Sequence, residues 1–259
     1  MEREGGAVVN DTIRLIQDHR SVREYLPREV SEEMIEEIVR SAQSAATSSF
    51  VQAYTVIAVR DPKIKRELAE LSGNRHVETC SVALVFCADA RRMMEAAGAG
   101  GRAGELSNTE LFIVATVDTA LAAENAALAA ESMGLGICFV GGIRNQIREV
   151  TRLLEIPRFV YPVFALTVGY PAERPEKKPR LPVEAVLHRD RYEPDRDAHI
   201  ADYDQMVSAY YRARTEGKRT HGWSEYVAQV LQAPRRPFMF DYLREQGFLE
   251  DTRGKSRQS

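Results

Sequence analysis

The segment 108–133 constrains the fold of this chain most, because it is long, rich in alanine and almost entirely apolar. Its composition predicts a helix that is apolar on most sides, and such a helix must be buried in a large core or at an interface between subunits. Gly134 and Gly136 follow directly and predict where the helix ends. Glu124 and Asn125 interrupt its longest apolar run, so we expect no membrane span here.

Shorter elements surround this helix. Runs of β-branched and apolar residues predict strands at 53–60, 81–88, 137–140 and 163–168. Helical spacing predicts helices at 11–18, 62–72 and 146–154, and one more that begins with Ser31 as its N-cap. The glycine-rich segment 91–105 is expected to be a mobile loop or an interrupted helix. The proline-rich segment 171–182 is expected to be extended, and residues 198–259 to form polar helices.

The composition excludes several classes of protein. Of the 259 residues, 44% are hydrophobic and 28% charged, which is typical of a globular chain with one domain, or one domain and an extension. A net charge of −3 argues against bulk binding of nucleic acid or anionic membranes. Three cysteines form no metal-like or redox-like pair, so we expect buried thiols, and residues 1–10 lack the pattern of a secretory signal. The protein is therefore expected to be cytoplasmic.

A cationic run lies near the first predicted helix and consists of His19, Arg20, Ser21, Val22 and Arg23. We interpret it as an early turn of that helix, where residues three apart share one side, so that both guanidiniums face the same way. Arginine forks bind phosphate through two hydrogen bonds, and a serine hydroxyl can hold one more oxygen. The alternative is a solvated or salt-bridged surface.

Two further segments favour the same kind of ligand, a flat molecule with a polyanionic end. Gly141 and Gly142 follow a predicted strand and would let a backbone amide approach a ligand closely, although they also suit an ordinary turn. Lys178 and Arg180 flank Pro179, which limits the direction in which the cations reach. A solvated basic loop is the alternative for this second segment.

Hydroxyl side chains gather before the first long strand, at Thr47, Ser48 and Ser49, where they could hold a polar chain of a ligand or simply serve the loop. The histidines show no metal-ligand spacing and are expected to be satisfied or at the surface. The sequence contains no acidic pair that suggests two-carboxylate hydrolysis, and no nucleophile elbow, P-loop or dinucleotide fingerprint. If the chain is an enzyme, we therefore expect its chemistry to come from a bound cofactor.

Taken in order along residues 11–249, these segments resemble the nitroreductase family of FMN-dependent oxidoreductases. The resemblance is closest to the larger oxygen-insensitive NADPH nitroreductases and NADPH-flavin oxidoreductases, and it rests on the motifs at 19–23, 47–52, 130–136, 140–145 and 178–182. It implies an α+β fold, a mostly antiparallel sheet covered by helices, with a C-terminal helical extension. The implied domains are a core at 11–197 and an extension at 198–251 that packs on the core and on the partner of a homodimer, with flexible ends at 1–10 and 252–259.

The resemblance also implies an FMN site. Arg20 and Ser21, with Lys178 and Arg180, would bind the phosphate and ribityl end, Arg23 would approach N1 of the flavin ring, and an amide of the glycine turn would approach N5. Asn74 or its neighbour would replace a glutamine that the family uses against the ring. The residues implied to hold FMN are His19, Arg20, Ser21, Arg23, Thr47, Ser48, Ser49, Gln52, Asn74, Phe139, Val140, Gly141, Gly142, Lys178 and Arg180.

The implied activity is ping-pong hydride transfer from NADPH, through FMN, to nitroaromatics, quinones or free flavins. Phe50 would border the substrate pocket, and Arg214, Arg219 and Arg236 would meet the 2′-phosphate of NADPH or else form a solvated basic face. No catalytic protein side chain or metal is implied, and neither nucleic acid nor a membrane is an expected partner. The alternatives are a flavin reductase that supplies a partner enzyme, a reductase of one dedicated metabolite or disulfide, and a non-catalytic flavin-binding protein.

Overall fold

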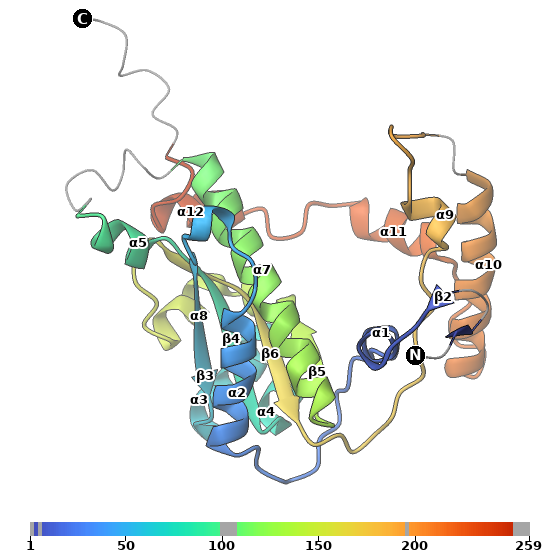
Figure 1. Cartoon of the computed structure of the whole chain (residues 1–259), viewed down its shortest axis with the longest axis horizontal. Helices are drawn as coiled ribbons and strands as arrows, with labels where there is room; N and C mark the ends of the chain where they lie inside the picture. The colour runs from blue at the N-terminus through green and yellow to red at the C-terminus, as the bar shows by residue number, and fades with distance from the viewer. Residues whose placement is uncertain (1–2, 5–6, 99–107, 195–196, 251–259) are drawn as a thin grey trace, which may run out of the picture. The chain divides into compact units, whose positions relative to one another are not determined.

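Four antiparallel strands form the central sheet. The computed structural model describes residues 3–4, 7–98, 108–194 and 197–250, and Figure 1 shows the elements. The strand order is β3-β4-β6-β5, with β3 at Tyr54–Val59, β4 at Val82–Asp89, β6 at Val160–Gly169 and β5 at Gly136–Val140. β4 lies inside the sheet and is buried along its whole length. Its position explains why its sequence is an apolar run rather than an alternating one.

The chain divides into two compact units, residues 1–175 with 238–259, and residues 176–237. The helices of the first unit are α1 (Asp11–Gln17), α2 (Glu32–Gln43), α3 (Pro62–Ser72), α4 (His76–Thr79), α5 (Arg91–Ala96), α7 (Thr109–Ser132), α8 (Ile147–Leu153) and α12 (Met239–Glu245). Short elements of this unit are 3-10 turns at Ser48–Phe50 and Gly141–Arg144 and the paired strands β1 (Arg3–Glu4) and β2 (Ala7–Val8).

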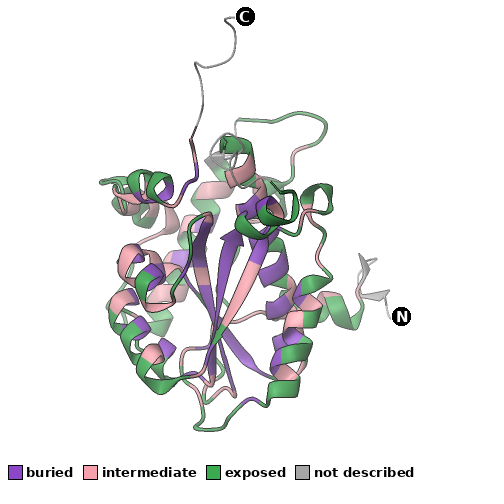
Figure 2. Cartoon of the chain, turned by 90° about the vertical axis from the view of Figure 1, so that its left-hand side faces the viewer, coloured by how far each residue is buried: buried purple, intermediate pink, exposed green. Residues whose placement is uncertain are grey.

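Helices cover both faces of the sheet, because successive side chains of β4 point to opposite faces. Leu84 and Phe86 pack in one apolar cluster with α2 and α7. Val85 and Cys87 pack in a second cluster with α3 and α8. In Figure 2 the buried strands stand between helices whose outer sides are exposed. The predicted fold class, an α+β fold with a mostly antiparallel sheet covered by helices, is confirmed.

α7 is the long apolar helix predicted at 108–133. Asn108 caps it by accepting a hydrogen bond from the amide of Leu111, and its row of alanines is buried against α2 and the sheet. Its other side leaves Ile113, Val117 and Leu121 about half exposed. Among the described residues α7 is the one helix long and apolar enough to cross a membrane, a criterion that a buried core helix also meets. The structure therefore buries one side of this helix and leaves an apolar side uncovered.

Two segments can be compared in detail with their predicted structure. Residues 91–96 form α5, which agrees with the interrupted helix and not with the mobile loop, the two alternatives for 91–105, while residues 99–105 lie outside the described residues. β6 begins at Val160, three residues before the predicted strand, although Pro162 lies within it. A shift in the register between Phe86 and Cys87 accommodates the proline, which has no amide to donate.

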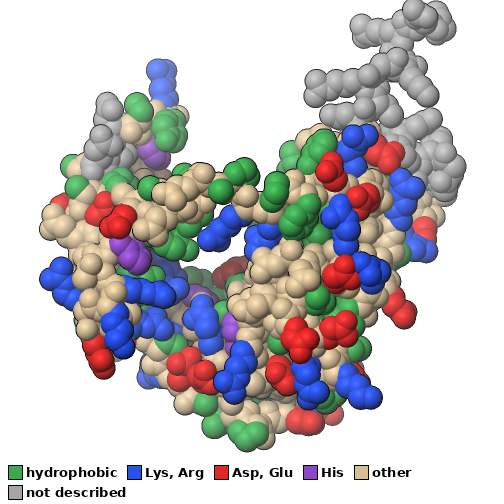
Figure 3. All heavy atoms as spheres, turned by 180° about the vertical axis from the view of Figure 1, so that it is seen from behind, with side chains coloured by type: hydrophobic (Ala, Val, Ile, Leu, Met, Phe, Trp, Pro, Cys, Tyr) green, Lys and Arg blue, Asp and Glu red, His purple; other side chains and the backbone are tan. Residues whose placement is uncertain are grey.

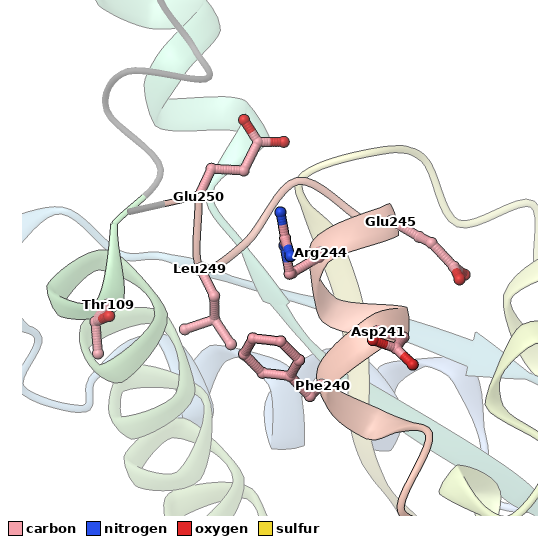
Figure 4. A pocket seen from close by; sticks show the side chains of 7 residues that line it. All are labelled: Thr109, Phe240, Asp241, Arg244, Glu245, Leu249 and Glu250. Carbon is pink, nitrogen blue, oxygen red and sulfur yellow. The ribbon is translucent and has the colours of Figure 1, made fainter. Parts of the chain in front are cut away.

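α12 packs with the first unit. Tyr242 and Phe248 are buried beside β4 and α7, and the hydroxyl groups of Tyr242 and Thr151 lie 2.6 Å apart. Next to α12 is an open cavity of about 820 Å³, which Figure 4 shows with its lining residues. The second compact unit, residues 176–237, has other bounds than the extension predicted at 198–251, which stays a prediction. The helices of the second unit are α9 (Val183–Val186), α10 (Asp197–Arg214) and α11 (Trp223–Leu231).

Candidate active site

The cationic run 19–23 lies in extended backbone beside β5, at the edge of the sheet. α1 ends at Gln17, Ser21 forms a parallel bridge with Ile137, and the amide of Val22 donates to the carbonyl of Ile137 at 2.8 Å. This approach needs a glycine at Gly136, because a Cβ there would lie 2.8 Å from Cγ1 of Val22. The helical interpretation of this run is therefore wrong, since pairing with a distant strand determines its backbone.

Arg20 is already engaged in an ion pair. Its guanidinium donates to both carboxylate oxygens of Asp18, at 2.6 and 3.1 Å, and to the backbone oxygen of the same residue at 2.9 Å. Arg174 donates to this carboxylate at 3.4 Å. Together with Glu131 and Glu173 these residues line a cavity of about 610 Å³. A phosphate that used the fork of Arg20 would have to compete with Asp18 for it.

His76 lies within electrostatic reach of Arg23, and its environment differs from the prediction that the histidines are satisfied or at the surface. It is 9% exposed, and its Nε2 has no hydrogen-bond partner among the described residues. Burial, and then the positive charge of Arg23, lowers the pKa of His76. A neutral imidazole with an unsatisfied, buried nitrogen therefore stands near a predicted flavin-binding cation. Nothing in the sequence separates this histidine from the others, because only packing buries it.

The glycine turn after β5 is in close contact with the end of α3. A Cβ on Gly142 would lie 2.3 Å from Nδ2 of Asn74 and 2.5 Å from the carbonyl oxygen of Ser72. That carbonyl accepts hydrogen bonds from Nδ2 of Asn74 at 2.7 Å and from Nδ2 of Asn145 at 3.0 Å. The structure thus brings together Asn74 and the turn that were both predicted to contact the flavin.

Three other predicted cofactor residues differ in accessibility. His19 lies 2.8 Å from a carboxylate oxygen of Glu131 through its Nδ1, which ties the cationic run to the end of α7. The side chain of Phe139 is 37% exposed, whereas Val140 is buried. Phe139 is therefore the more accessible of these two predicted contacts.

The predicted hydroxyl cluster belongs to an exposed loop with unusual backbone angles. Ser49, Phe50 and Gln52 have φ values of 48°, 61° and 52°, in the left-handed region. Both ends of this loop hydrogen-bond to Asp118, which is fully buried on α7. The sequence analysis missed Asp118, because one acidic residue in an apolar helix does not reveal which segment it contacts.

In the second unit, Lys178 and Arg180 border a small cavity with aromatic walls. The hydroxyl of Tyr203 donates to the carbonyl of Pro179 at 3.1 Å and so anchors the segment between the two cations. The cavity has a volume of about 190 Å³, and its aromatic lining consists of Tyr203, Tyr210, Tyr211, Trp223 and Tyr226. That these cations meet Arg20 at one phosphate stays a prediction.

The three arginines predicted for the 2′-phosphate of NADPH also belong to the second unit. Arg214 ends α10 and donates to the hydroxyl of Tyr210 at 2.7 Å. Arg219 is exposed in the turn that follows, and Arg236 is partly buried with a φ of 55°. Their role in recognising NADPH stays a prediction.

Comparisons with known proteins identify the family of this chain. The model described as "Nitroreductase family" matches residues 16–170, and the one described as "Nitroreductase family, C-terminal domain" matches residues 178–251. The FMN reductase (NADPH) of Bacillus subtilis is 46% identical over 246 residues, which are 93% of this chain and 99% of that relative. The oxygen-insensitive NADPH nitroreductase of Salmonella typhimurium is 37% identical over 241 residues, again 93% and 99%.

A solved structure gives the same result for the fold. The NfrA1 nitroreductase from B. subtilis matches with a TM-score of 0.89 at 45% identity, covering 93% of this chain and 100% of that one. The family predicted from the motifs is thereby confirmed. This chain belongs to the nitroreductase family, and its sheet and helices form the nitroreductase fold.

Proposed function

We propose that this protein is an FMN-dependent NADPH oxidoreductase that passes hydride, in a ping-pong order, to small acceptors such as nitroaromatics, quinones and free flavins. Relatives that span almost the whole chain are named FMN reductase (NADPH) and oxygen-insensitive NADPH nitroreductase. The observation that carries the proposal is local to the first unit. There the cationic run pairs with β5, and the glycine turn that follows β5 contacts the end of α3.

The residues at this place fit FMN. The missing side chain of Gly142 lets the backbone of this turn lie close to Asn74, a predicted flavin contact, and the unsatisfied Nε2 of His76 would be met by the polar edge of a ligand. Arg20, Lys178 and Arg180 would hold the phosphate. FMN, when bound, would supply N5, the atom that accepts hydride from NADPH and returns it to an acceptor.

The side chains of this protein would bind FMN, orient it and tune its reduction. The fixed charge of Arg23 would stabilise the negative charge that collects near N1 on reduction. Phe50, which is 83% exposed, would border the space that NADPH and the acceptor use in turn. Arg214, Arg219 and Arg236 would favour NADPH over NADH by pairing with its 2′-phosphate.

We further propose a homodimer. The uncovered apolar side of α7 supports it, because an exposed apolar patch on a helix commonly marks an interface. The C-terminal extension would pack on the core and on the partner. The three cysteines are buried thiols, as suits a protein of the reducing cytoplasm. Small molecules are the proposed partners, and on the face shown in Figure 3 acidic and basic side chains both occur.

An anaerobic visible spectrum of the FMN-loaded protein, before and after one equivalent of NADPH, tests the proposal. Rapid bleaching of the flavin bands would support it, and profiling of acceptors by stopped flow would then rank nitroaromatics against free flavins. Flavin that NADPH leaves oxidised would contradict the NADPH assignment. Protein that takes up no FMN would overturn the proposal as a whole.

A further inference from the structure

The loop 48–53, between α2 and β3, holds a backbone that its own residues do not favour. Ser49, Phe50 and Gln52 lie in the left-handed region, where side chains other than glycine and asparagine are uncommon. Three such residues within four positions do not persist unless the surrounding structure holds them. The side chains of Ser49, Phe50 and Gln52 are exposed, so their packing does not supply that restraint, although Val51 and Ala53 of the same loop pack against the apolar core.

Asp118 holds both ends of this loop. Its Oδ1 accepts a hydrogen bond from the amide of Ser48 at 2.9 Å, and its Oδ2 accepts one from the amide of Ala53 at 3.1 Å. The side chain is fully buried on α7, where hydrogen bonds to a carboxylate are stronger than in water. The carbonyl of Ala53 also accepts from the amide of Asp89 at 2.9 Å, so this end of the loop is joined to β4 as well.

The residues between the two anchored amides are the ones that a ligand can reach. Ser48, Ser49, Phe50 and Gln52 are exposed, and Phe50 is 83% exposed. These four side chains are among those predicted to contact FMN or the acceptor. A loop with fixed ends and an accessible middle is suited to presenting them in one arrangement before a ligand arrives.

We propose that Asp118 is a positioning residue that pre-organises the loop 48–53 for binding of the flavin and of the acceptor. The inference rests on the proposed function, and it adds to it a residue that touches no ligand. Only a carboxylate serves both amides, because each of its two oxygens is an acceptor. The amide of an asparagine would turn a donor toward one of the two backbone N–H groups.

The test compares Asp118→Asn with Thr119→Val. Asparagine has nearly the shape of aspartate, so the variant changes the hydrogen bonds and not the packing. Thr119 is equally buried on the same helix, but its hydroxyl bonds to the carbonyl of Ala115 within α7 and not to the loop. It therefore controls for any general loosening of the helix.

Chymotrypsin cleavage after Phe50 in the FMN-free proteins reports the loop directly. We expect cleavage of Asp118→Asn to be at least about tenfold faster than that of wild type and of Thr119→Val, at temperatures where circular dichroism shows all three folded. The dissociation constant for FMN, from quenching of its fluorescence, should rise by about tenfold, which corresponds to about 1.4 kcal/mol. The acceptor KM should rise more than kcat falls.

Loop cleavage and FMN affinity in Asp118→Asn that match those of Thr119→Val would overturn the inference. So would equal losses in both variants, because these would show only a weakened helix. Wild-type protein that binds no FMN would instead contradict the proposed function, and the chymotrypsin comparison separates that result from a failure of the loop anchor.

Discussion

The guanidinium of Arg23 is the charge that we expect to tune the flavin. The backbone amide of Arg23 donates a hydrogen bond to the carboxylate of Glu173 at 3.0 Å, and its guanidinium donates one to the carbonyl of Ser21 at 3.2 Å. These two bonds hold the backbone and the side chain of this residue in place. Arg23→Ala should weaken FMN binding and lower the midpoint potential by about 30–60 mV, because a charged hydrogen bond contributes about 1.5–3 kcal/mol. A redox titration of the loaded variant measures this. Arg23→Lys, which keeps the charge, should recover part of the potential, and an unchanged potential in the alanine variant would reject the role.

His76 should make the FMN-free protein sensitive to acid. Its pKa is lowered in the folded state, first by burial and then by Arg23, whereas an unfolded histidine titrates near pH 6.5. Below about pH 6.5 the unfolded state therefore binds more protons, and the free energy of unfolding falls as the pH decreases. The melting temperature of wild type should drop more between about pH 7.5 and 5.5 than that of His76→Gln. Parallel curves for the two proteins would contradict the assignment.

At the scale of elements, the contact between the glycine turn and α3 is the one that tolerates least change. In Gly142→Ala the new Cβ would meet the backbone oxygen of Ser72, which cannot move without shifting the end of α3. We expect a loss of about 1–3 kcal/mol in the free energy of unfolding, with weaker FMN binding. Chemical denaturation and fluorescence titration measure the two effects.

Gly141→Ala is the matched control for this turn. The nearest atom to its Cβ would be the terminal nitrogen of the flexible Arg144 side chain, at 3.2 Å. It should therefore cost clearly less stability than Gly142→Ala. Equal losses of unfolding free energy in the two variants would show that the contact with Ser72 does not cause the loss in Gly142→Ala.

Elements whose ends carry local signals could be predicted closely. α3 spans the predicted 62–72, because Asp61 caps its start, Pro62 suits its first turn and Gly73 ends it in a left-handed conformation. The run 19–23 was predicted as helical and is extended, because its partner is Ile137. No sequence pattern within five residues of Ser21 predicts that pairing.

At the scale of the whole molecule, the uncovered side of α7 should hold the dimer together. Val117→Glu combined with Leu121→Glu would place charges on this side without touching the buried alanines. We expect monomers in sedimentation velocity, because charged side chains on this face oppose its burial. Leu26→Glu, at a residue of similar exposure outside this helix, should remain dimeric. If the double variant stays dimeric, the dimer interface does not lie on this side of α7.

The sequence alone determined most of the elements through helix caps and apolar periodicity, and it determined the family, with the fold class that the family implies, through ordered motifs. Caps, periodicity and motifs can be read from the order of residues without any tertiary contact. The residues that it marked for the candidate site stay a prediction. Only the tertiary structure decided that Arg20 is paired with Asp18, that His76 is buried with an unsatisfied nitrogen, and that Asp118 anchors the loop 48–53. Each of these depends on which distant segments pack together, and the burial and charge that result belong to no single stretch of the chain.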